Sequence, residues 1–247
     1  MDRAIYLVMT GASHTLQAQA ANSHNLANAS TVGFKADLSA ARSERVAGGQ
    51  LDSRVNALLE DRGWDPTQGH LQSTGRDLDI ALHHDAWLAV IAPDGTEAYS
   101  RNGSLKLTAE GQLVNAGGHA VLGEGGPVAI PPASSISIGA DGTISVVPEG
   151  QSASTVAVIN RLRVVQAGAA DLERGADGLM RAAADVELQA KAGDVLSTGM
   201  LESSNVNPTE ALVQMIELAR QFELQVKVMK TAEENERSAS TLSRLNG

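Results

Sequence analysis

The clearest hydrophobic pattern lies near the C-terminus, where apolar residues recur at alternating steps of three and four. This spacing is typical of a coiled-coil seam along one long helix. Asn207, Pro208 and Glu210 are favoured at a helix N-terminus, so the helix is predicted to begin at Pro208 and to end near Leu245. The predicted seam residues are Leu212, Met215, Ala219, Phe222, Val226 and Met229.

A second helical stripe opens the chain and predicts a helix from about Asp2 to Asn28. Small and amide side chains interrupt its bulky positions, so the helix would be marginal alone. Gly33 stands where this pattern ends and is predicted to take a positive φ, with Phe34 turning inward as an anchor. The candidate residues of this region are Ile5, Met9, Ala12, Leu16, Asn25, Leu26, Asn28, Gly33 and Phe34.

Between the two helical patterns, turn-forming pairs such as Asp-Gly and Asn-Gly separate short apolar runs. Such pairs favour tight hairpins, so residues 71–186 are predicted to form an antiparallel β domain. Residues 36–70 show no clear period and are predicted to be an extended connector, and residues 187–204 return the chain to the second helix.

The predicted class is therefore α+β, a mainly antiparallel central domain flanked by long terminal helices that form a coiled-coil-like assembly region. Residues 1–35 and 205–247 would be the assembly segments. The alternative, in which both helices pack into one globular core, stays open at this point.

Composition narrows the range of partners. The formal net charge is −10 and there is no basic run, which argues against nucleic acid and anionic membranes. The chain has no cysteine, which excludes disulfides. No segment approaches the roughly 18 apolar residues of a membrane span. Arg3 and Ala18-Gln-Ala20 imitate parts of a signal peptide, but Ser13-His-Thr15 interrupts the apolar run, so no cleavage is expected.

Enzymatic sites are weakly supported. His83-His84-Asp85, or Asp77 with Asp79, could be drawn as metal ligands, but neither set has further ligands at a recognised spacing. Gly123-Glu-Gly-Gly126 lacks the context of a dinucleotide site. The sequence therefore predicts no catalytic residue, no metal and no cofactor. A secreted β-domain enzyme or a sugar-binding module is the runner-up.

Three stretches of the chain resemble the signatures of the bacterial flagellar rod and hook axial proteins, in the order of that family. They are Asn25-Leu-Ala-Asn-Ala-Ser-Thr-Val-Gly-Phe-Lys35, then Thr74-Gly-Arg-Asp-Leu-Asp-Ile-Ala-Leu82 with Tyr99-Ser-Arg-Asn-Gly103, and finally Leu201-Glu-Ser-Ser-Asn-Val-Asn207 with the helix behind it. His84-Asp-Ala-Trp87 departs from the Gly-Asp-Gly-aromatic pattern usual in the family. The opening residues and the short length are most similar to proximal rod members, with distal rod or hook subunits as alternatives.

The resemblance implies a structural subunit that polymerises through its terminal helices into the torque-transmitting axial shaft of the flagellum. Its implied partners are other copies of itself, proximal and distal rod subunits, and the export apparatus, without nucleic acid or membrane insertion. Type III export and a place in the basal body, in the periplasmic space, follow from the same resemblance. Asn205 and Asn207 of the C-terminal motif complete the expected assembly interface.

Overall fold

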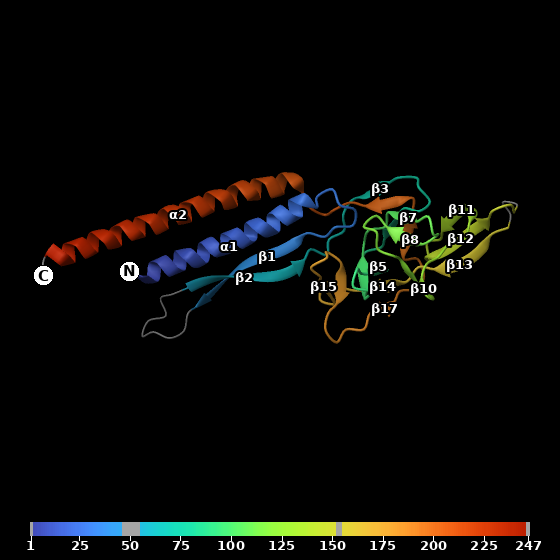
Figure 1. The fold of residues 1–247 in the computed structure, drawn as a ribbon, viewed down its shortest axis with the longest axis horizontal. Helices are drawn as coiled ribbons and strands as arrows, with labels where there is room; N and C mark the ends of the chain where they lie inside the picture. The colour runs from blue at the N-terminus through green and yellow to red at the C-terminus, as the bar shows by residue number, and fades with distance from the viewer. Residues whose placement is uncertain (1, 46–54, 152–154, 246–247) are drawn as a thin grey trace. The chain divides into compact units, whose positions relative to one another are not determined.

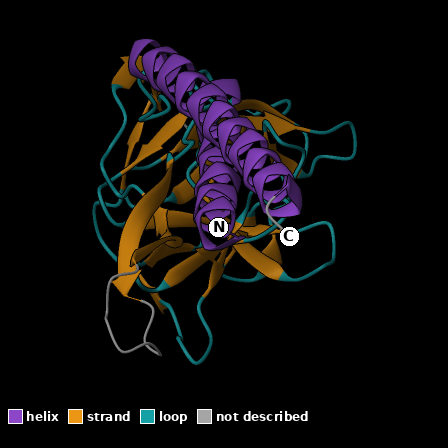
Figure 2. Cartoon of the chain, turned by 90° about the vertical axis from the view of Figure 1, so that its left-hand side faces the viewer, coloured by secondary structure: helices purple, strands orange, loops and turns teal. Residues whose placement is uncertain are grey.

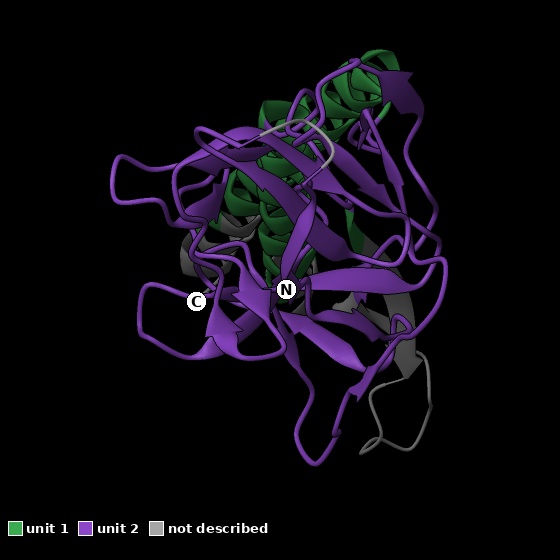
Figure 3. Ribbon diagram, turned by 90° about the vertical axis from the view of Figure 1, so that its right-hand side faces the viewer, with its two compact units in different colours: residues 1–27, 37–62, 207–247 green, residues 28–36, 63–206 purple. Residues whose placement is uncertain are grey.

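The computed structural model describes residues 2–45, 55–151 and 155–245. The chain divides into two compact units, shown in Figure 3: unit 1 holds residues 1–27, 37–62 and 207–247, and unit 2 holds residues 28–36 and 63–206. The elements are α1 (Asp2–Ala27), β1 (Asp37–Arg45), β2 (Val55–Trp64), β3 (Leu71–Ser73), β4 (Ile80–Leu82), β5 (Ala86–Ile91), β6 (Glu97–Ser100), β7 (Leu105–Leu107), β8 (Leu113–Asn115), β9 (Leu122–Gly123), β10 (Gly126–Pro127), β11 (Ala133–Ile138), β12 (Thr143–Pro148), β13 (Ala157–Arg161), β14 (Val164–Gln166), β15 (Leu172–Arg174), β16 (Met180–Ala182), β17 (Gln189–Ala190), β18 (Leu196–Thr198), β19 (Met200–Glu202) and α2 (Pro208–Leu245).

Unit 1 is built on two antiparallel helices, which lie side by side in Figures 1 and 2. The side-chain oxygen of Asn207 caps α2 by accepting hydrogen bonds from the backbone N–H groups of Thr209 (3.1 Å) and Glu210 (3.4 Å). At the same end of the pair, the Asn22 amide of α1 donates to the carbonyl of Ala211 in the first turn of α2, at 2.7 Å. β1 and β2 pair with each other, and β1 contacts α1. The stretch expected as a connector therefore contributes strands to unit 1.

The α+β class fits, but the predicted coiled-coil-like assembly region is wrong. A coiled coil needs apolar side chains from both helices at its seam. α1 instead buries a small and two polar residues, Ala12, Thr15 and Asn22, while Met9 and Leu16 are 53% and 48% exposed. The paired strands β1 and β2 also belong to the same unit, so the region is not made of helices alone.

The seam on α2 is also displaced from its predicted line. Leu212 and Val226, two of the predicted seam residues, are 50% and 42% exposed. The less exposed positions of this helix are Ala211, Met215, Leu218, Ala219, Phe222, Gln225, Met229 and Ala232. Gln225 reaches the backbone of α1 at Gly11, where an added Cβ would lie 3.3 Å from its Nε2 atom. The buried face is therefore rotated toward positions that a purely apolar count did not select.

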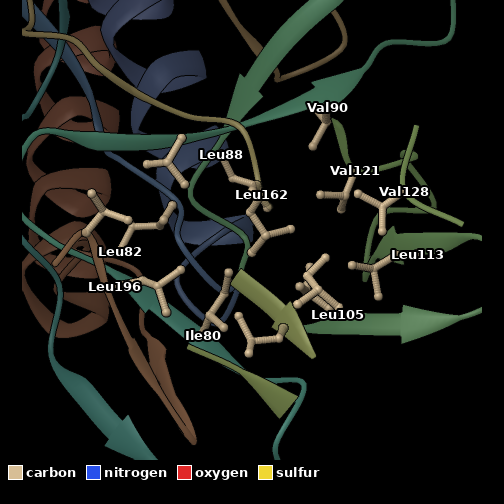
Figure 4. Close-up of a cluster of buried hydrophobic side chains, with 14 of the residues drawn as sticks. Ile80, Leu82, Leu88, Val90, Leu105, Leu113, Val121, Val128, Leu162 and Leu196 are labelled. Atoms are coloured by element: carbon tan, nitrogen blue, oxygen red, sulfur yellow. The ribbon is translucent and has the colours of Figure 1, made fainter. Parts of the chain in front are cut away.

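Unit 2 is organised around a six-stranded sheet with the order β15-β16-β6-β5-β14-β17. Successive side chains of a strand point to opposite faces, so β5 supplies two separate cores. Leu88 and Val90 join the main cluster shown in Figure 4. Trp87 and Ala89 join a smaller cluster on the other face.

Smaller sheets complete unit 2 and tie late strands to early ones. β11, β12 and β13 form a three-stranded antiparallel sheet. Four pairs, β7-β8, β9-β10, β4-β18 and β3-β19, are also antiparallel. β18 and β19 are the last strands before α2. They pair with β4 and β3, which come early in unit 2.

Glycine serves two different purposes in these turns. Gly95 and Gly142 take φ values of +82° and +85°, as predicted from the Asp-Gly pairs that contain them, and Gly111 after Glu110 takes +81°. The same prediction was wrong for Gly103 of the Asn-Gly pair, which does not take a positive φ. Gly103 instead permits close packing, since an added Cβ would lie 1.8 Å from the carbonyl oxygen of Ile80. The Gly103 carbonyl accepts the backbone hydrogen bond of Ile80 at 2.9 Å.

We expect Gly103→Ala to destabilise unit 2 by at least about 2 kcal/mol, because the added methyl must displace the backbone of β4. Chemical denaturation followed by the fluorescence of Trp64 and Trp87 would measure the change. Gly125→Ala is the matched control, because no atom lies within 4 Å of its added Cβ. Equal stability of the two variants would contradict this account of Gly103.

Candidate assembly site

The three signature motifs meet in unit 2 at one buried carboxylate. Glu202, at the end of β19, is 1% exposed. Its Oε2 atom accepts hydrogen bonds from Nε and Nη2 of Arg101 at 2.8 and 2.5 Å, and its Oε1 atom lies 2.7 Å from Nζ of Lys35. Oε1 also accepts from the backbone N–H of Gly69 at 3.0 Å. Each motif therefore supplies one charged residue to the same cluster.

The Arg101 guanidinium donates hydrogen bonds to backbone carbonyls as well as to Glu202. Beyond Glu202, it donates to the backbone carbonyls of Leu82 (2.8 Å), His84 (2.9 Å) and Ala86 (2.8 Å). These carbonyls belong to the end of β4, the following turn and the start of β5. The guanidinium also lies 5.5 Å from the centre of the Trp87 ring, where a cation–π contact is favourable. Arg101 thus fixes the turn that departs from the usual family pattern.

Lys35 is the second cation of the cluster and is 2% exposed. Its ammonium group also donates to the carbonyl of Thr67 at 2.6 Å. Burial lowers the pKa of Lys35 below its ordinary value, and the hydrogen bond to Glu202 opposes this shift. Two cations share one anion, so the cluster depends on hydrogen bonds to backbone as well as on charge pairing.

Around this cluster, the chain segments that flank the two helices are joined directly. The backbone N–H of Gly33 donates to the carbonyl of Glu202 at 2.8 Å. The Asn205 side chain accepts from the N–H of Ala36 at 2.7 Å and donates to the carbonyl of Asp65 at 3.1 Å. Phe34 is buried, and the Arg174 guanidinium lies 4.7 Å from the centre of its ring.

In unit 1, the end of α1 holds the start of β1. The Asn25 amide pairs with the backbone of Asp37, donating to its carbonyl at 3.0 Å and accepting from its N–H at 2.8 Å. His24 Nδ1 lies 2.6 Å from the Asp37 carboxylate. A groove of about 330 Å³ lies beside these contacts, lined in part by Leu38, Gln214 and Leu218.

The predicted site residues are thus found in several settings. Gly33 has φ +70°, as predicted, and an added Cβ would lie 2.3 Å from the carbonyl oxygen of Arg101. α1 ends at Ala27, so Gly33 closes the following turn. Asn25 and Asn205 bond backbone of their own chain. The side chain of Ile5 lies outside the described residues. Asn28 Oδ1 accepts a hydrogen bond from Thr31 Oγ1 at 3.1 Å.

Sequence reasoning missed Lys35, Arg101 and Glu202 as a group, although all three lie inside the motifs that it selected. Each is a charged residue in or beside a buried strand or turn, which signals a paired partner. Their pairing crosses 101 and 167 positions of sequence, from Arg101 and Lys35 to Glu202. No local pattern could have assigned it.

The residues considered as metal ligands have protein partners instead. His83 hydrogen-bonds through its ring to the carbonyl of Asp194 and the hydroxyl of Ser197, both at 3.2 Å. Asp85 pairs with Lys191, whose hydrogen bond lowers the pKa of the Asp85 carboxyl, and also contacts Gln166. Within residues 2–45, 55–151 and 155–245, no three His, Asp or Glu residues gather in a metal-binding arrangement. In the same ranges, neither helix has an apolar stretch that could cross a bilayer.

Comparison with known families matches the chain in three places. Residues 5–35 match the model described as flagella basal body rod protein, residues 81–146 match the flagellar hook protein FlgE/F/G D1 domain, and residues 197–242 match the flagellar basal body rod FlgEFG protein C-terminal model. The flagellar basal-body rod protein FlgF of Salmonella typhimurium is 46% identical over 98% of both chains. FlgF of Escherichia coli K12 is 45% identical over 98% of both chains. The chain belongs to the FlgF family of flagellar basal-body rod proteins.

A related rod protein is less similar. The flagellar basal-body rod protein FlgG of Buchnera aphidicola subsp. Acyrthosiphon pisum is 32% identical over 86% of this chain and 88% of its own. This FlgF-family chain is a structural rod subunit of the basal body rather than an enzyme. Each matched region supplies one charged residue to the cluster around Glu202: Lys35, Arg101 and Glu202 itself.

We expect Glu202→Gln to destabilise this rod protein by about 3–5 kcal/mol, because the change leaves two buried cations without an anion. Thermal or urea unfolding of unit 2, followed by tryptophan fluorescence, would measure the loss. Glu173→Gln, at an exposed position of β15, removes the same charge and should change stability little. A loss below about 1 kcal/mol for Glu202→Gln would show that the cluster is not a major source of stability.

Proposed function

We propose that this protein polymerises through unit 1 into the proximal part of the flagellar rod, with other copies and other rod proteins as neighbours. The observation that carries the proposal is the apolar surface of unit 1. On α2, Ile216 and Leu224 are 55% and 64% exposed, and on α1, Tyr6 is 65% exposed. Other exposed large apolar residues among the described side chains of the two helices are Met9, Leu16, Leu212, Val213, Val226 and Val228. A surface of this kind typically marks a protein-interaction site.

The apolar arc of α2 is wider than α1 can cover. Leu212 and Ile216 lie four residues apart on one side of the helix, next to Ala211, which is buried, and Met215, which is partly buried. α1 packs on the side that holds Ala211, and Leu212 and Ile216 remain 50% and 55% exposed. A neighbouring subunit that covered these exposed residues would gain apolar burial at roughly 25 cal/mol per Å².

Buried polar groups of the helix pair support the same proposal. In the described residues, both ring nitrogens of His14 and the Oε1 atom of Gln225 are buried without a hydrogen-bond partner. Such groups weaken the pairing of α1 with α2, since each unmade hydrogen bond costs free energy. The helix pair therefore gains from further contacts, which an assembled rod would supply.

Membership of the rod-protein family is the ground on which we propose where the protein is located and how it is exported. We infer that contacts repeat head to tail without closing, which generates a filament. The site residues named in the sequence analysis, from Ile5 to Met229, are proposed to act in assembly. Type III export, contact with the export apparatus and a periplasmic position in the rod are proposed on the same ground.

Retention of the N-terminal segment is also proposed. Ala18-Gln-Ala20, which imitates a signal-peptidase site, lies in the middle of α1. Cleavage there would remove Ala12 and Thr15, two of the buried residues of the helix pair. The assembly unit thus requires the segment that a signal peptidase would discard.

We expect Leu212→Asp to lower incorporation into rods about tenfold or more, because a buried carboxylate without a partner opposes docking. Counting subunits in purified basal bodies and measuring swimming would test this. The isolated variant should unfold like the unaltered protein, since Leu212 is half exposed in the free chain.

The control is Thr231→Asp, which adds the same charge at an exposed polar position of α2. It should assemble and swim normally. Normal assembly of Leu212→Asp would contradict a role for this face of α2. Loss of folding by Leu212→Asp would instead favour a single globule whose core includes the residue.

The N-terminus offers a separate test. Mass spectrometry of the subunit from purified rods should recover peptides that cover residues 2–20, because α1 is retained. A mature chain that begins at Ala21 would contradict uncleaved export, while leaving the assembly role of α2 intact.

A further inference from the structure

Charged residues on the first half of α2 form two pairs with the same spacing. Glu210 and Glu217 lie seven residues apart, and so do Arg220 and Lys227. Seven residues are almost two turns of an α-helix, so the members of each pair lie on the same side of α2. Each base follows an acid by ten residues, which turns the basic pair roughly 80° around the helix axis from the acidic pair. α2 therefore carries an acidic stripe, Glu210 with Glu217, and a basic stripe, Arg220 with Lys227.

The four side chains of the two stripes are exposed, and none of them has an ion-pair partner in the described part of the chain. Glu223 lies four residues before Lys227, but the two do not form an ion pair. An ion pair that α2 does contain joins Arg237 to Glu233, further along the helix. The two stripes are therefore available for contact with another molecule.

The acidic stripe borders the groove of unit 1 described above. Glu217 lines this groove together with Asp37 of β1, and the described residues of its lining include no lysine or arginine. Leu38 and Leu218 add apolar surface to the lining, and Leu38 is 41% exposed. The groove thus offers carboxylates beside apolar side chains, which suits a partner that carries basic and apolar residues together.

The basic stripe has this composition. Leu224 lies between Arg220 and Lys227 on the same side of α2 and is 64% exposed. The segment from Arg220 to Lys227 spans about 10 Å of helix, and so does the wall of the groove from Gln214 to Gln221. The stripe and the groove therefore match in length as well as in charge.

A parallel copy of α2 shifted by ten residues, about 15 Å, satisfies both stripes at once. This shift brings Lys227 of one copy to Glu217 of the next, and Arg220 to Glu210. It also places Leu224 beside Gln214 at the groove. No other shift brings both bases to both acids, because the remaining combinations pair one base with one acid.

We propose that the basic stripe of α2 in one copy docks into the acidic groove of unit 1 in the next copy, in this register. The proposal rests on the polymerisation proposed above and names its contact. Two copies of net charge −10 repel at long range, so local pairing of opposite charges decides where they meet. Exposed ion pairs add little affinity, so the stripes set the register while apolar residues supply the burial. The contact joins two different surfaces, so it repeats without closing.

Charge reversal tests the register. Glu217→Lys and Lys227→Glu should each lower incorporation into rods about tenfold or more, because each places like charges against each other. The double variant that combines them should restore incorporation to within about twofold, because opposite charges face each other again. The two residues lie about 15 Å apart on one helix and cannot touch within a chain, so restoration requires contact between copies.

Lys230→Glu is the matched control. It makes the same change of charge at an exposed lysine of α2 that lies about 60° further around the axis than Lys227, and it should assemble normally. All these variants should unfold like the unaltered protein, because the altered side chains are in solvent. Equal loss of assembly by Lys230→Glu and Lys227→Glu would overturn the register. A double variant as defective as the single ones would overturn it too.

Leu212→Asp separates this inference from the proposed function. If Leu212→Asp blocks assembly and both single charge reversals assemble normally, the register is wrong and polymerisation through unit 1 stands. If Leu212→Asp also assembles normally, both proposals are wrong.

The identity of the neighbour has its own measurement. The chain has no cysteine, so Gln214→Cys with Leu224→Cys introduces two thiols and keeps all four charges of the stripes. Within one chain these positions lie about 15 Å apart, too far for a disulfide, whereas the proposed register brings them together between copies. Mild oxidation of rods should therefore yield a ladder of linked subunits, which either cysteine alone should not yield. Rods without a ladder, or links to a different rod protein, would overturn a second copy as the occupant.

Discussion

A single buried carboxylate sets the arrangement of unit 2. Glu202 is almost inaccessible to water, and an unpaired charge at such a position would cost several kcal/mol. The fold meets this constraint by bringing Lys35 and Arg101 to its two oxygens. Arg101 in turn requires the carbonyls at the end of β4 and the start of β5. The position of the turn between those strands, and of the strand that carries Glu202, is therefore set by one hydrogen-bonded cluster.

This constraint explains why the motif after α1 and the motif before α2 occur in the same chain: each supplies a residue to the same buried cluster. The chain leaves α1, passes Lys35 and enters β1, and it returns through Glu202 before α2 begins. The contact of Gly33 with Glu202 and the contacts of Asn205 with Ala36 and Asp65 join the two passages. The residues of the two terminal signatures therefore hold the two passages of one subunit together, in addition to any contact they make between subunits. A free N-terminal segment could not complete unit 2 without the segment that precedes α2.

Local patterns predicted what local physics controls. The start of α2 follows from Asn207 and Pro208, and several hairpin turns follow from glycines that take positive φ. The cluster around Glu202 could not be predicted in this way, because its partners are distant in sequence. β1 and β2 were missed because residues 36–70 lack alternation, and the strands pair with each other beside α1. The assembly roles of the candidate residues, and the proposed division into assembly and central segments, stay predictions.

The buried side of α2 differs from the predicted seam for a reason that counting apolar residues could not show. Asn22 of α1 reaches the carbonyl of Ala211, and Gly11 admits Gln225, so polar and small residues decide which side of α2 is buried. Apolar side chains then extend past that buried side to Leu212 and Ile216. A helix with one partner needs one stripe, whereas a helix with two partners needs a wider arc. The seam predicted from the sequence therefore combined residues that α1 covers, such as Met215, with residues that stay exposed, such as Leu212. The predicted seam line thus runs between the side of α2 that α1 covers and the side that remains exposed.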